Sequence, residues 1–337
     1  MEDGIIVFVR HEKQSRESVA GDSMVEYQRC MISKSSSTYW LRRTRTANQI
    51  YGVETNRMSV ELPEAMILAE QMTKTLLGKQ IKACEMRDYV KLQKIGFINK
   101  DIREFDRLIG CKIISIHQRG NVIRVQLNKK LNLVLGPDYG ADILYHSSEE
   151  SLPKKHHLKV GFADGSYLTI RQTGMGMVYC AADNEVNNLY VVKRDFSETP
   201  SPIGENQFTF DKFSELLDRR GQNIKAAIVG RTAVVVGLSN AAFQEIIYKA
   251  GIHPKRNTST LSDSQKRDLF DAMMEILNAR VSSGGKENWL DLYGEPGRHI
   301  PVMGPNMKDK NCPQCGARIE MIAHGGGQVY FCPNCQK

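Results

Sequence analysis

Residues 234–262 read VVVGLSNAAFQEIIYKAGIHPKRNTSTLS, and this stretch decides how the second half of the chain folds. Apolar side chains recur at helical spacing behind the tight turn that Gly237 and Ser239 allow, so the sequence predicts a helix over residues 237–251. His253 and Pro254 follow this helix, and we interpret the pair as structural. The apolar positions expected in the buried core are Ile246, Ile247 and Ile252.

Three more helical stretches flank this one. The last of them begins with Ser262 and Gln265 in the arrangement of a capping box, and its apolar side chains form one stripe. The four expected helices are residues 208–220, 223–231, 237–251 and 261–281. The stripe consists of Leu269, Phe270, Met273, Ile276 and Leu277. This part of the sequence therefore predicts a helical domain.

The preceding part of the chain, residues 80–196, has the period-2 alternation of β-strands. An Asp-Gly pair at Asp164 and Gly165 predicts a hairpin between two of them. The expected strands lie within residues 111–120, 121–128, 131–136, 157–170 and 178–182. A β-rich domain of this length is expected to form a sandwich or a small barrel, and SETPSPIGENQ (197–207) is interpreted as a linker to the helices.

A helix is expected to lead into the strands. In ELPEAMILAEQMTKTLLGK (61–79), Pro63 and Glu64 suit a first helical turn and Gly78 suits the position just past the helix end. Residues 1–57 show neither a strand nor a helix period, so we expect a disordered or weakly structured extension.

The composition sets further limits. Lys and Arg exceed Asp and Glu, giving a net charge of +8. This excess fits a polyanionic partner, although a merely basic surface has the same composition. Runs of 18 apolar residues and a secretory signal are both lacking, so we expect a cytoplasmic protein without a membrane span.

The last part of the chain has metal-ligand spacing. CPQCGARIEMIAHGGGQVYFCPNC (312–335) contains two Cys-x-x-Cys pairs separated by 16 residues. Two such turns give four thiolates at about 2.3 Å from one Zn²⁺, which leaves no open position, so the zinc is expected to be structural. A pair of disulfides fits poorly with a reducing compartment. The expected ligands are Cys312, Cys315, Cys332 and Cys335, on two strands joined by a turn at residues 325–327.

Three motifs in a fixed order carry a resemblance: the ELPE helix start, the GLSN helix, and a cysteine hairpin that ends in CPNCQK. Together they resemble the formamidopyrimidine-DNA glycosylase and endonuclease VIII family, from about Ser59 to Lys337. The resemblance implies an α+β fold. An N-terminal β-sandwich domain with a leading helix (58–196) would be followed by the linker, a helix-two-turn-helix domain (208–300) and a zinc finger (308–337).

The resemblance also implies a function. Members of the family bind double-stranded DNA at a damaged base or abasic site, flip the damaged base out of the stack and excise it. An amino-terminal amine forms a Schiff base with the sugar, after which elimination cuts the strand (AP lyase activity). The chain would act as a monomer, with zinc as its cofactor.

Site residues follow position by position from the resemblance. Val60 stands at the nucleophile position, Glu61 at the acid beside it, and Glu64 at the second carboxylate. Helix-dipole compensation is the alternative role for both acids. The candidate DNA-binding residues are Gly237, Ser239, Asn240 and Gln328, because N–H groups and amides at a helix start attract a phosphate. An ordinary first-turn role is the alternative for Asn240.

The chain departs from the family at four places, one of which is RQTGMGM (171–177), where the family has an Arg-rich segment that fills the gap behind a flipped base. Val60 replaces a proline, and its nitrogen lies in a peptide bond, which has no available lone pair. Either the true start of the protein lies nearer Val60, or the Schiff-base route is closed. Asn121 replaces a lysine, and Gly327 replaces a phosphate-gripping arginine. Two hypotheses follow: an active DNA glycosylase, in which Glu61 activates water, and a catalytically reduced protein of the same fold that binds damaged DNA without cutting it.

Overall fold

The structure is a computed structural model that describes residues 59–95, 98–136, 141–172, 176–205, 208–230 and 232–337. The extension predicted over residues 1–57 lies outside the described residues. In the described part of the chain, every helix is too short or too polar to cross a lipid bilayer.

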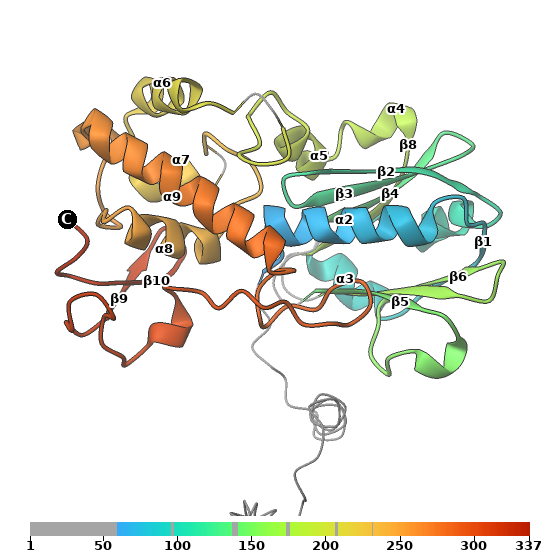
Figure 1. The fold of residues 1–337 in the computed structure, drawn as a ribbon. Helices are drawn as coiled ribbons and strands as arrows, with labels where there is room; N and C mark the ends of the chain where they lie inside the picture. The colour runs from blue at the N-terminus through green and yellow to red at the C-terminus, as the bar shows by residue number, and fades with distance from the viewer. Residues whose placement is uncertain (1–58, 96–97, 137–140, 173–175, 206–207, 231) are drawn as a thin grey trace, which may run out of the picture. The chain divides into compact units, whose positions relative to one another are not determined.

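The leading helix, α2 (Leu62–Leu76), links the two halves of the molecule. Pro63 lies in its first turn, and Gly78 adopts a φ of +82° just past its end, as the sequence predicts. Its apolar face divides between two cores. Leu62 packs among the C-terminal helices, whereas Leu68 and Met72 pack among the strands. In Figure 1, α2 lies beside β2 and crosses α9, and both contacts are direct.

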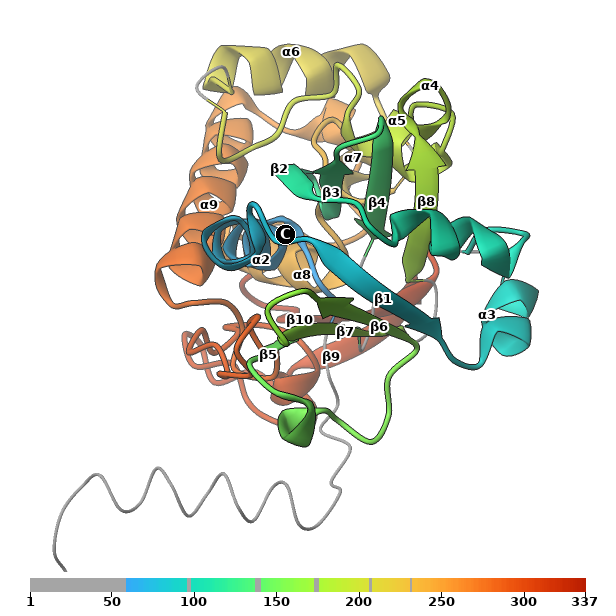
Figure 2. The same cartoon turned by 90° about the vertical axis from the view of Figure 1, so that its right-hand side faces the viewer.

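The strands form two antiparallel four-stranded sheets, which Figure 2 shows on either side of the end of α2. One sheet has the order β1-β6-β7-β5 and consists of Ile81–Met86, Leu158–Phe162, Tyr167–Arg171 and Asp142–His146. The other has the order β2-β3-β4-β8 and consists of Ile113–Arg119, Val122–Leu127, Leu131–Gly136 and Met177–Ala182. Apolar side chains from both sheets share one core, which is the β-sandwich expected from the sequence. The predicted hairpin joins β6 to β7, with Gly165 at a φ of +85°.

The C-terminal half is helical and has its own core. Its helices are α6 (Phe210–Arg220), α7 (Ile224–Ile228), α8 (Asn240–Lys249) and α9 (Asp263–Ser282). The capping box of Ser262 and Gln265 is present at the start of α9, and the three predicted core isoleucines are fully buried. The chain then runs through a 3₁₀ turn (Pro305–Met307) to the hairpin of β9 (Glu320–His324) and β10 (Gly327–Phe331).

Several expectations need correction. The segment between residues 80 and 196 also contains α3 (Tyr89–Ile95), a 3₁₀ helix (Ile102–Leu108), a 3₁₀ turn (Glu149–Ser151), α4 (Asp183–Val186) and α5 (Tyr190–Asp195). These elements are two turns or shorter, which is too short for a helical period to emerge from the sequence. The strands β1 and β5 were not predicted either. Similarly, α7 is shorter than the helix expected over 223–231. Gly327 belongs to β10, so the hairpin turn consists of Gly325 and Gly326 alone.

The segment after α5 does not behave as a free spacer. The guanidinium of Arg119, at the end of β2, donates to the backbone carbonyls of Asp195, Ser197 and Thr199. It also forms an ion pair with Glu205 at 2.7 Å. One arginine therefore fixes the connection between the halves against the β-sandwich.

Gly237 packs tightly against the N-terminal half. A Cβ atom at Gly237 would lie 2.6 Å from Cα of Gly120, in the β2–β3 turn, and 2.9 Å from Cβ of Leu62. Both neighbours belong to the N-terminal half and neither is the flexible end of a side chain. Glycine is therefore required here both by packing and by its φ of +78°.

We expect Gly237→Ala to destabilise the protein by about 1–3 kcal/mol from overpacking, in addition to about 1 kcal/mol for its left-handed backbone. Gly165→Ala is the matched control, because Gly165 has a similar φ of +85° and no heavy atom within 4 Å of its added Cβ. Urea denaturation of both variants measures the difference. Equal losses of unfolding free energy would contradict the proposed packing constraint.

Candidate functional site

The four C-terminal cysteines converge on one point. Their sulfur atoms all lie within 4.8 Å of one another, with Cys312 and Cys335 at 3.8 Å and Cys315 and Cys332 at 3.4 Å. Tetrahedral zinc with bonds of about 2.3 Å places its sulfurs about 3.8 Å apart, whereas a disulfide needs about 2.05 Å. The four thiols are free, so the geometry fits one structural zinc ion and excludes the disulfide alternative.

The zinc hairpin is held against the helices by α8. The hydroxyl of Tyr248 lies 3.3 Å from Sγ of Cys312. One turn earlier in α8, Gln244 accepts a hydrogen bond from the backbone N–H of Tyr330 in β10. These contacts hold α8 in a defined position relative to the metal site.

Two of the predicted DNA-binding residues meet at that start. Asn240 is the first residue of α8, and its amide donates to the backbone carbonyl of Gln328 in β10 at 2.7 Å. The side chain of Gln328 is exposed. The structure therefore brings Asn240 and Gln328 together at the junction of α8 and the zinc hairpin.

Three other predicted residues, Val60, Gly237 and Ser239, line a cavity of about 500 Å³ between the halves, together with Asn121. The amide of Asn121 donates to the carbonyl of Val60 at 3.3 Å and accepts a hydrogen bond from Arg194 at 2.5 Å. The cavity is thus lined by Val60 at the nucleophile position of the resemblance, by Asn121 at its lysine position, and by the turn before α8.

Glu61 and Glu64 lie outside the lining of this cavity and are fully buried. Arg280 from α9 binds Glu61 at 2.5 Å and Glu64 at 2.6 Å, while Nζ of Lys286 lies 3.5 Å and 3.7 Å from the same two carboxylates. We call these four residues the ion quartet. Each of its four side chains has an exposure of 0%. Its two negative and two positive charges cancel, which is how charges are tolerated in a core.

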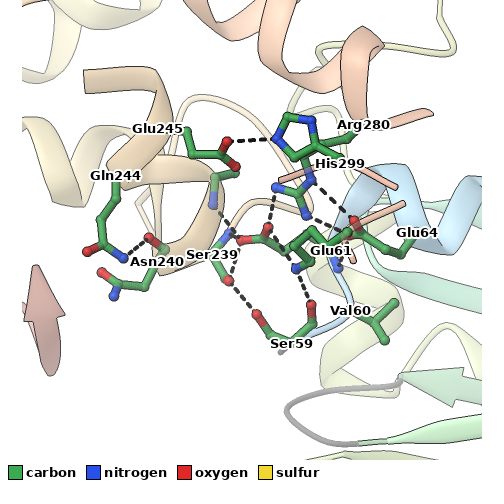
Figure 3. A network of polar contacts seen from close by, with 12 residues as sticks. Ser59, Val60, Glu61, Glu64, Ser239, Asn240, Gln244, Glu245, Arg280 and His299 are labelled. Carbon is green, nitrogen blue, oxygen red and sulfur yellow. Dashed lines mark hydrogen bonds and ion pairs between the residues drawn. The ribbon is translucent and has the colours of Figure 1, made fainter. Parts of the chain in front are cut away.

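Glu61 receives further hydrogen bonds from the start of α8. The N–H of Ser239 donates at 2.8 Å and the N–H of Ala242 at 3.1 Å, and the Ser239 hydroxyl donates to the same oxygen. Figure 3 shows this network, with the side chain of Val60 turned away from both carboxylates. Burial would raise the pKa of Glu61, but Arg280, Lys286 and these hydrogen bonds lower it to about 2. Glu61 is therefore a fixed anion at neutral pH, and its role exceeds helix-dipole compensation.

The segment before Val60 takes part in the site. The ammonium of Lys286 donates to the backbone carbonyl of Ser59 at 2.6 Å, and the hydroxyls of Ser59 and Ser239 lie 2.9 Å apart. Val60 itself is 2% exposed. The peptide bond between Ser59 and Val60 is thus held by the protein where the family has a free amine.

Sequence reasoning missed both cations of the quartet. One signal was available for Arg280, because it continues the apolar stripe of α9 at a spacing of four from Ile276 and three from Leu277. A charged residue on a buried stripe needs a buried partner. Lys286 follows two glycines in an irregular segment and gave no such signal.

This fold and site define a class, the zinc-finger DNA glycosylases built from a β-sandwich and a helix-two-turn-helix domain. Family comparison agrees along the chain. Residues 60–174 match the formamidopyrimidine-DNA glycosylase N-terminal domain, residues 199–289 match the formamidopyrimidine-DNA glycosylase H2TH domain, and residues 309–337 match the zinc finger found in FPG and IleRS. The chain belongs to the formamidopyrimidine-DNA glycosylase (Fpg, MutM) family.

The similarity to individual members is moderate and covers nearly their whole length. The formamidopyrimidine-DNA glycosylase of Streptococcus pneumoniae is 28% identical over 284 residues, which is 82% of this chain and 98% of the relative. That of Bacillus licheniformis is 29% identical over 287 residues, with coverages of 82% and 99%. The structure resembles Lactococcus lactis Fpg in complex with abasic-site DNA, with a TM-score of 0.70 at 24% identity over 82% of this chain and 99% of that one. This structural likeness establishes the fold.

We expect purified protein to contain one zinc ion per chain, and Cys315→Ser to lose it because three thiolates and a hydroxyl bind zinc more weakly. Atomic absorption measures the metal, and thermal unfolding should show a lower midpoint for the variant, because zinc supplies folding energy to the hairpin. Cys84→Ser is the control. Its thiol lies outside the cluster, in β1, so it should retain the metal. Equal zinc content in the two variants would refute the assignment.

We expect Glu61→Gln to destabilise the protein by about 3–5 kcal/mol at pH 7, because it leaves buried cations under-compensated. The pKa of Glu61 is lower in the folded state than its ordinary value of 4.5. Its stabilisation is therefore complete above pH 4.5 and is lost as the pH falls toward 2. The difference in unfolding free energy between wild type and variant should shrink across this window.

The control is Glu104→Gln, which removes a surface ion pair with Arg107 and should cost at most about 1 kcal/mol. Chemical denaturation at a series of pH values between 3 and 7 tests both variants. A difference for Glu61→Gln that stays constant across the series would show that Glu61 is not a buried, ion-paired anion.

Proposed function

We propose that this protein binds double-stranded DNA at a damaged base or abasic site and does not cut the strand through an amino-terminal Schiff base. The observation that carries the proposal is that the fold is retained while the amine position is occupied by an internal peptide bond. The relatives are glycosylases of formamidopyrimidine DNA by name, and the similar Lactococcus lactis structure holds abasic-site DNA.

Binding is supported by the arrangement of the C-terminal half. The side-chain amide of Asn240, at the start of α8, lies against Gln328 in the zinc hairpin, and side-chain amides are groups that position a DNA phosphate. The cavity at Val60 and Asn121 lies between the halves. A monomer presents both features, so we propose that one copy binds one lesion.

Three groups in the site disfavour Schiff-base chemistry. The nitrogen of Val60 is an amide, whose lone pair is delocalised into the peptide carbonyl. That carbonyl, on Ser59, is fixed by the ammonium of Lys286. Glu61 is paired with two cations and is therefore a poor proton acceptor. The scaffold of the site is intact, but its reactive groups are engaged with one another.

Excision of an oxidised base by water is the second candidate function, and one contact favours it. The hydroxyl of Ser239 lines the cavity and donates to Glu61, so it links the buried carboxylate to the space a nucleotide would occupy. In this mechanism Glu61 and Ser239 would orient a water molecule toward the sugar. The water oxygen would bond to C1′ as the bond from C1′ to the base breaks, and the proton that the water loses would pass to the released base, which leaves the strand uncut.

The full chain, incubated with a duplex that carries a single abasic site, should form a complex that sodium borohydride does not convert to a covalent adduct. Electrophoresis under native conditions detects the complex, and denaturing electrophoresis detects the adduct. We expect affinity to fall steeply with salt concentration, because phosphate contacts release counterions. A borohydride-trapped adduct, or a failure to bind the duplex at low ionic strength, would contradict the proposal.

Duplexes with an oxidised purine or pyrimidine separate the two candidates. Release of the free base without an adduct identifies the water mechanism, and no release with retained binding identifies a binding protein. Ser239→Ala provides the matched variant, because it removes the hydroxyl that contacts Glu61 and Ser59 and keeps the backbone N–H that donates to Glu61. Asn278→Ala, an exposed amide on α9, controls for unspecific effects.

A further inference from the structure

A corner of the β-sandwich, at the end of α2, exposes aliphatic side chains. Leu77, the residue after α2, is 51% exposed, Ile114 in β2 is 49% exposed, and Ile109, the residue after the 3₁₀ helix, is 43% exposed. The N–H of Gly78 donates to the carbonyl of Ile113 at 2.9 Å, so the segments that carry Leu77 and Ile114 are direct neighbours. Aliphatic side chains gathered on a surface commonly mark a place where another molecule binds.

Three exposed lysines lie among these side chains. Cε of Lys112 would lie 3.9 Å from a Cβ atom built on Gly78, and Nζ of Lys129 would lie 3.5 Å from one built on Gly110. Lys130 follows Lys129 in the turn between β3 and β4, and all three lysine side chains are exposed. We call this surface the lysine corner. It consists of Leu77, Ile109, Ile114, Lys112, Lys129 and Lys130.

The charges of the three lysines are not neutralised by the protein. In the part of the chain that the structure describes, none of the three forms an ion pair with a carboxylate. The cations beside them are neutralised, because Lys79 is paired with Asp164 and Arg107 with Glu104. The exposed carboxylate of Asp106 offsets at most one of the remaining charges. The lysine corner therefore has a net positive charge around its aliphatic side chains.

The backbone of the lysine corner is unusual at two places. Lys129 has a φ of +62° and Lys130 a φ of +57°, a left-handed region that glycine and asparagine adopt more readily than lysine. The register of β2 with β3 shifts between Ile113 and Ser115, so Ile114 lies at a β-bulge, which redirects a side chain. Strained residues are commonly kept where a protein functions. Both irregularities present their side chains at the same corner.

We propose that the lysine corner binds an acidic segment of a partner protein. Carboxylates of the segment would contact the three lysines, and its aliphatic side chains would pack on Leu77, Ile109 and Ile114. The inference goes beyond the proposed function. Glu61 lies at the start of α2, and a helix of 15 residues is about 22 Å long. The lysine corner, at the end of α2 that lies away from the helical half in Figure 1, is thus separate from the cavity at Val60.

A protein segment fits this surface better than other occupants. A second copy in a symmetric dimer would place the same lysines against one another, and like charges repel. Single strands of nucleic acid bind where bases stack on aromatic rings, and the lysine corner has aliphatic side chains instead. Interfaces with duplex DNA are more polar than interfaces between proteins, so exposed leucine and isoleucine favour a protein.

Fluorescence anisotropy with the labelled peptide Asp-Asp-Leu-Glu-Glu-Ile-Asp-Asp tests the proposal in the full-length, zinc-loaded protein. One control peptide has serine in place of leucine and isoleucine. The other has asparagine and glutamine in place of aspartate and glutamate. We expect the wild type to bind the first peptide about fivefold more tightly than either control, because the lysine corner offers both charge and apolar surface.

Lys129→Asn combined with Lys130→Gly removes two charges and supplies residues that adopt a positive φ readily. We expect affinity for the peptide to fall about fivefold at low salt and by less at high salt. The thermal midpoint should rise, because the strain of the turn is relieved. Lys154→Asn combined with Lys155→Gly is the matched control, since it removes the same charge from another exposed lysine pair and should leave peptide affinity unchanged.

Ile114→Ser should also weaken peptide binding, whereas Val90→Ser, which changes a 66% exposed side chain on α3, should not. Failure of the wild type to bind the peptide, equal affinity in the Lys129 and Lys130 double variant, or equal binding of the serine control peptide would overturn the inference. A loss of affinity for an abasic-site duplex in the double variant would assign the lysine corner to DNA and would also overturn it. Duplex binding by the wild type tests the proposed function separately.

Discussion

The carboxylate of Glu61 is bound from three directions, by Arg280 at the end of α9, by Lys286 in the segment that follows, and by the first N–H groups of α8. All three lie in the C-terminal half, whereas Glu61 lies at the start of α2, which packs against the sheets. A single anion thus joins the halves. Because the site is fully buried, water cannot replace any missing partner, and the arrangement holds only when every charge is present.

The same interaction changes what the site can do. A carboxylate used as a proton acceptor must have a lone pair to offer, and the oxygens of Glu61 are already engaged by cations and N–H groups. Val60 contributes an amide nitrogen, Asn121 an amide side chain and Gly327 no side chain. The fold of the family is kept, and the carboxylate of Glu61 is engaged in structural contacts within it.

Local patterns in the sequence were sufficient for much of the fold. Caps, glycine positions and cysteine spacing identified α2, the β6–β7 hairpin, α9 and the zinc site, because each depends on residues close together in the chain. Arg280 and Lys286 were not identified, since their partners lie more than 200 residues away and only the place of Arg280 on the apolar stripe of α9 gave a local signal. The short helices α4 and α5 are determined by packing against the sheet, not by their own periodicity.

The hydrogen bond from Lys286 to Ser59 has an implication for the architecture of the whole chain. An enzyme that uses its N-terminal amine as a nucleophile must start at that residue, so no segment can precede it. In this protein the buried lysine recognises a peptide carbonyl, a group that exists only if the chain continues upstream of residue 60. A chain that started at residue 60 would lack this carbonyl, so the contact with Lys286 makes Ser59 an integral part of the fold.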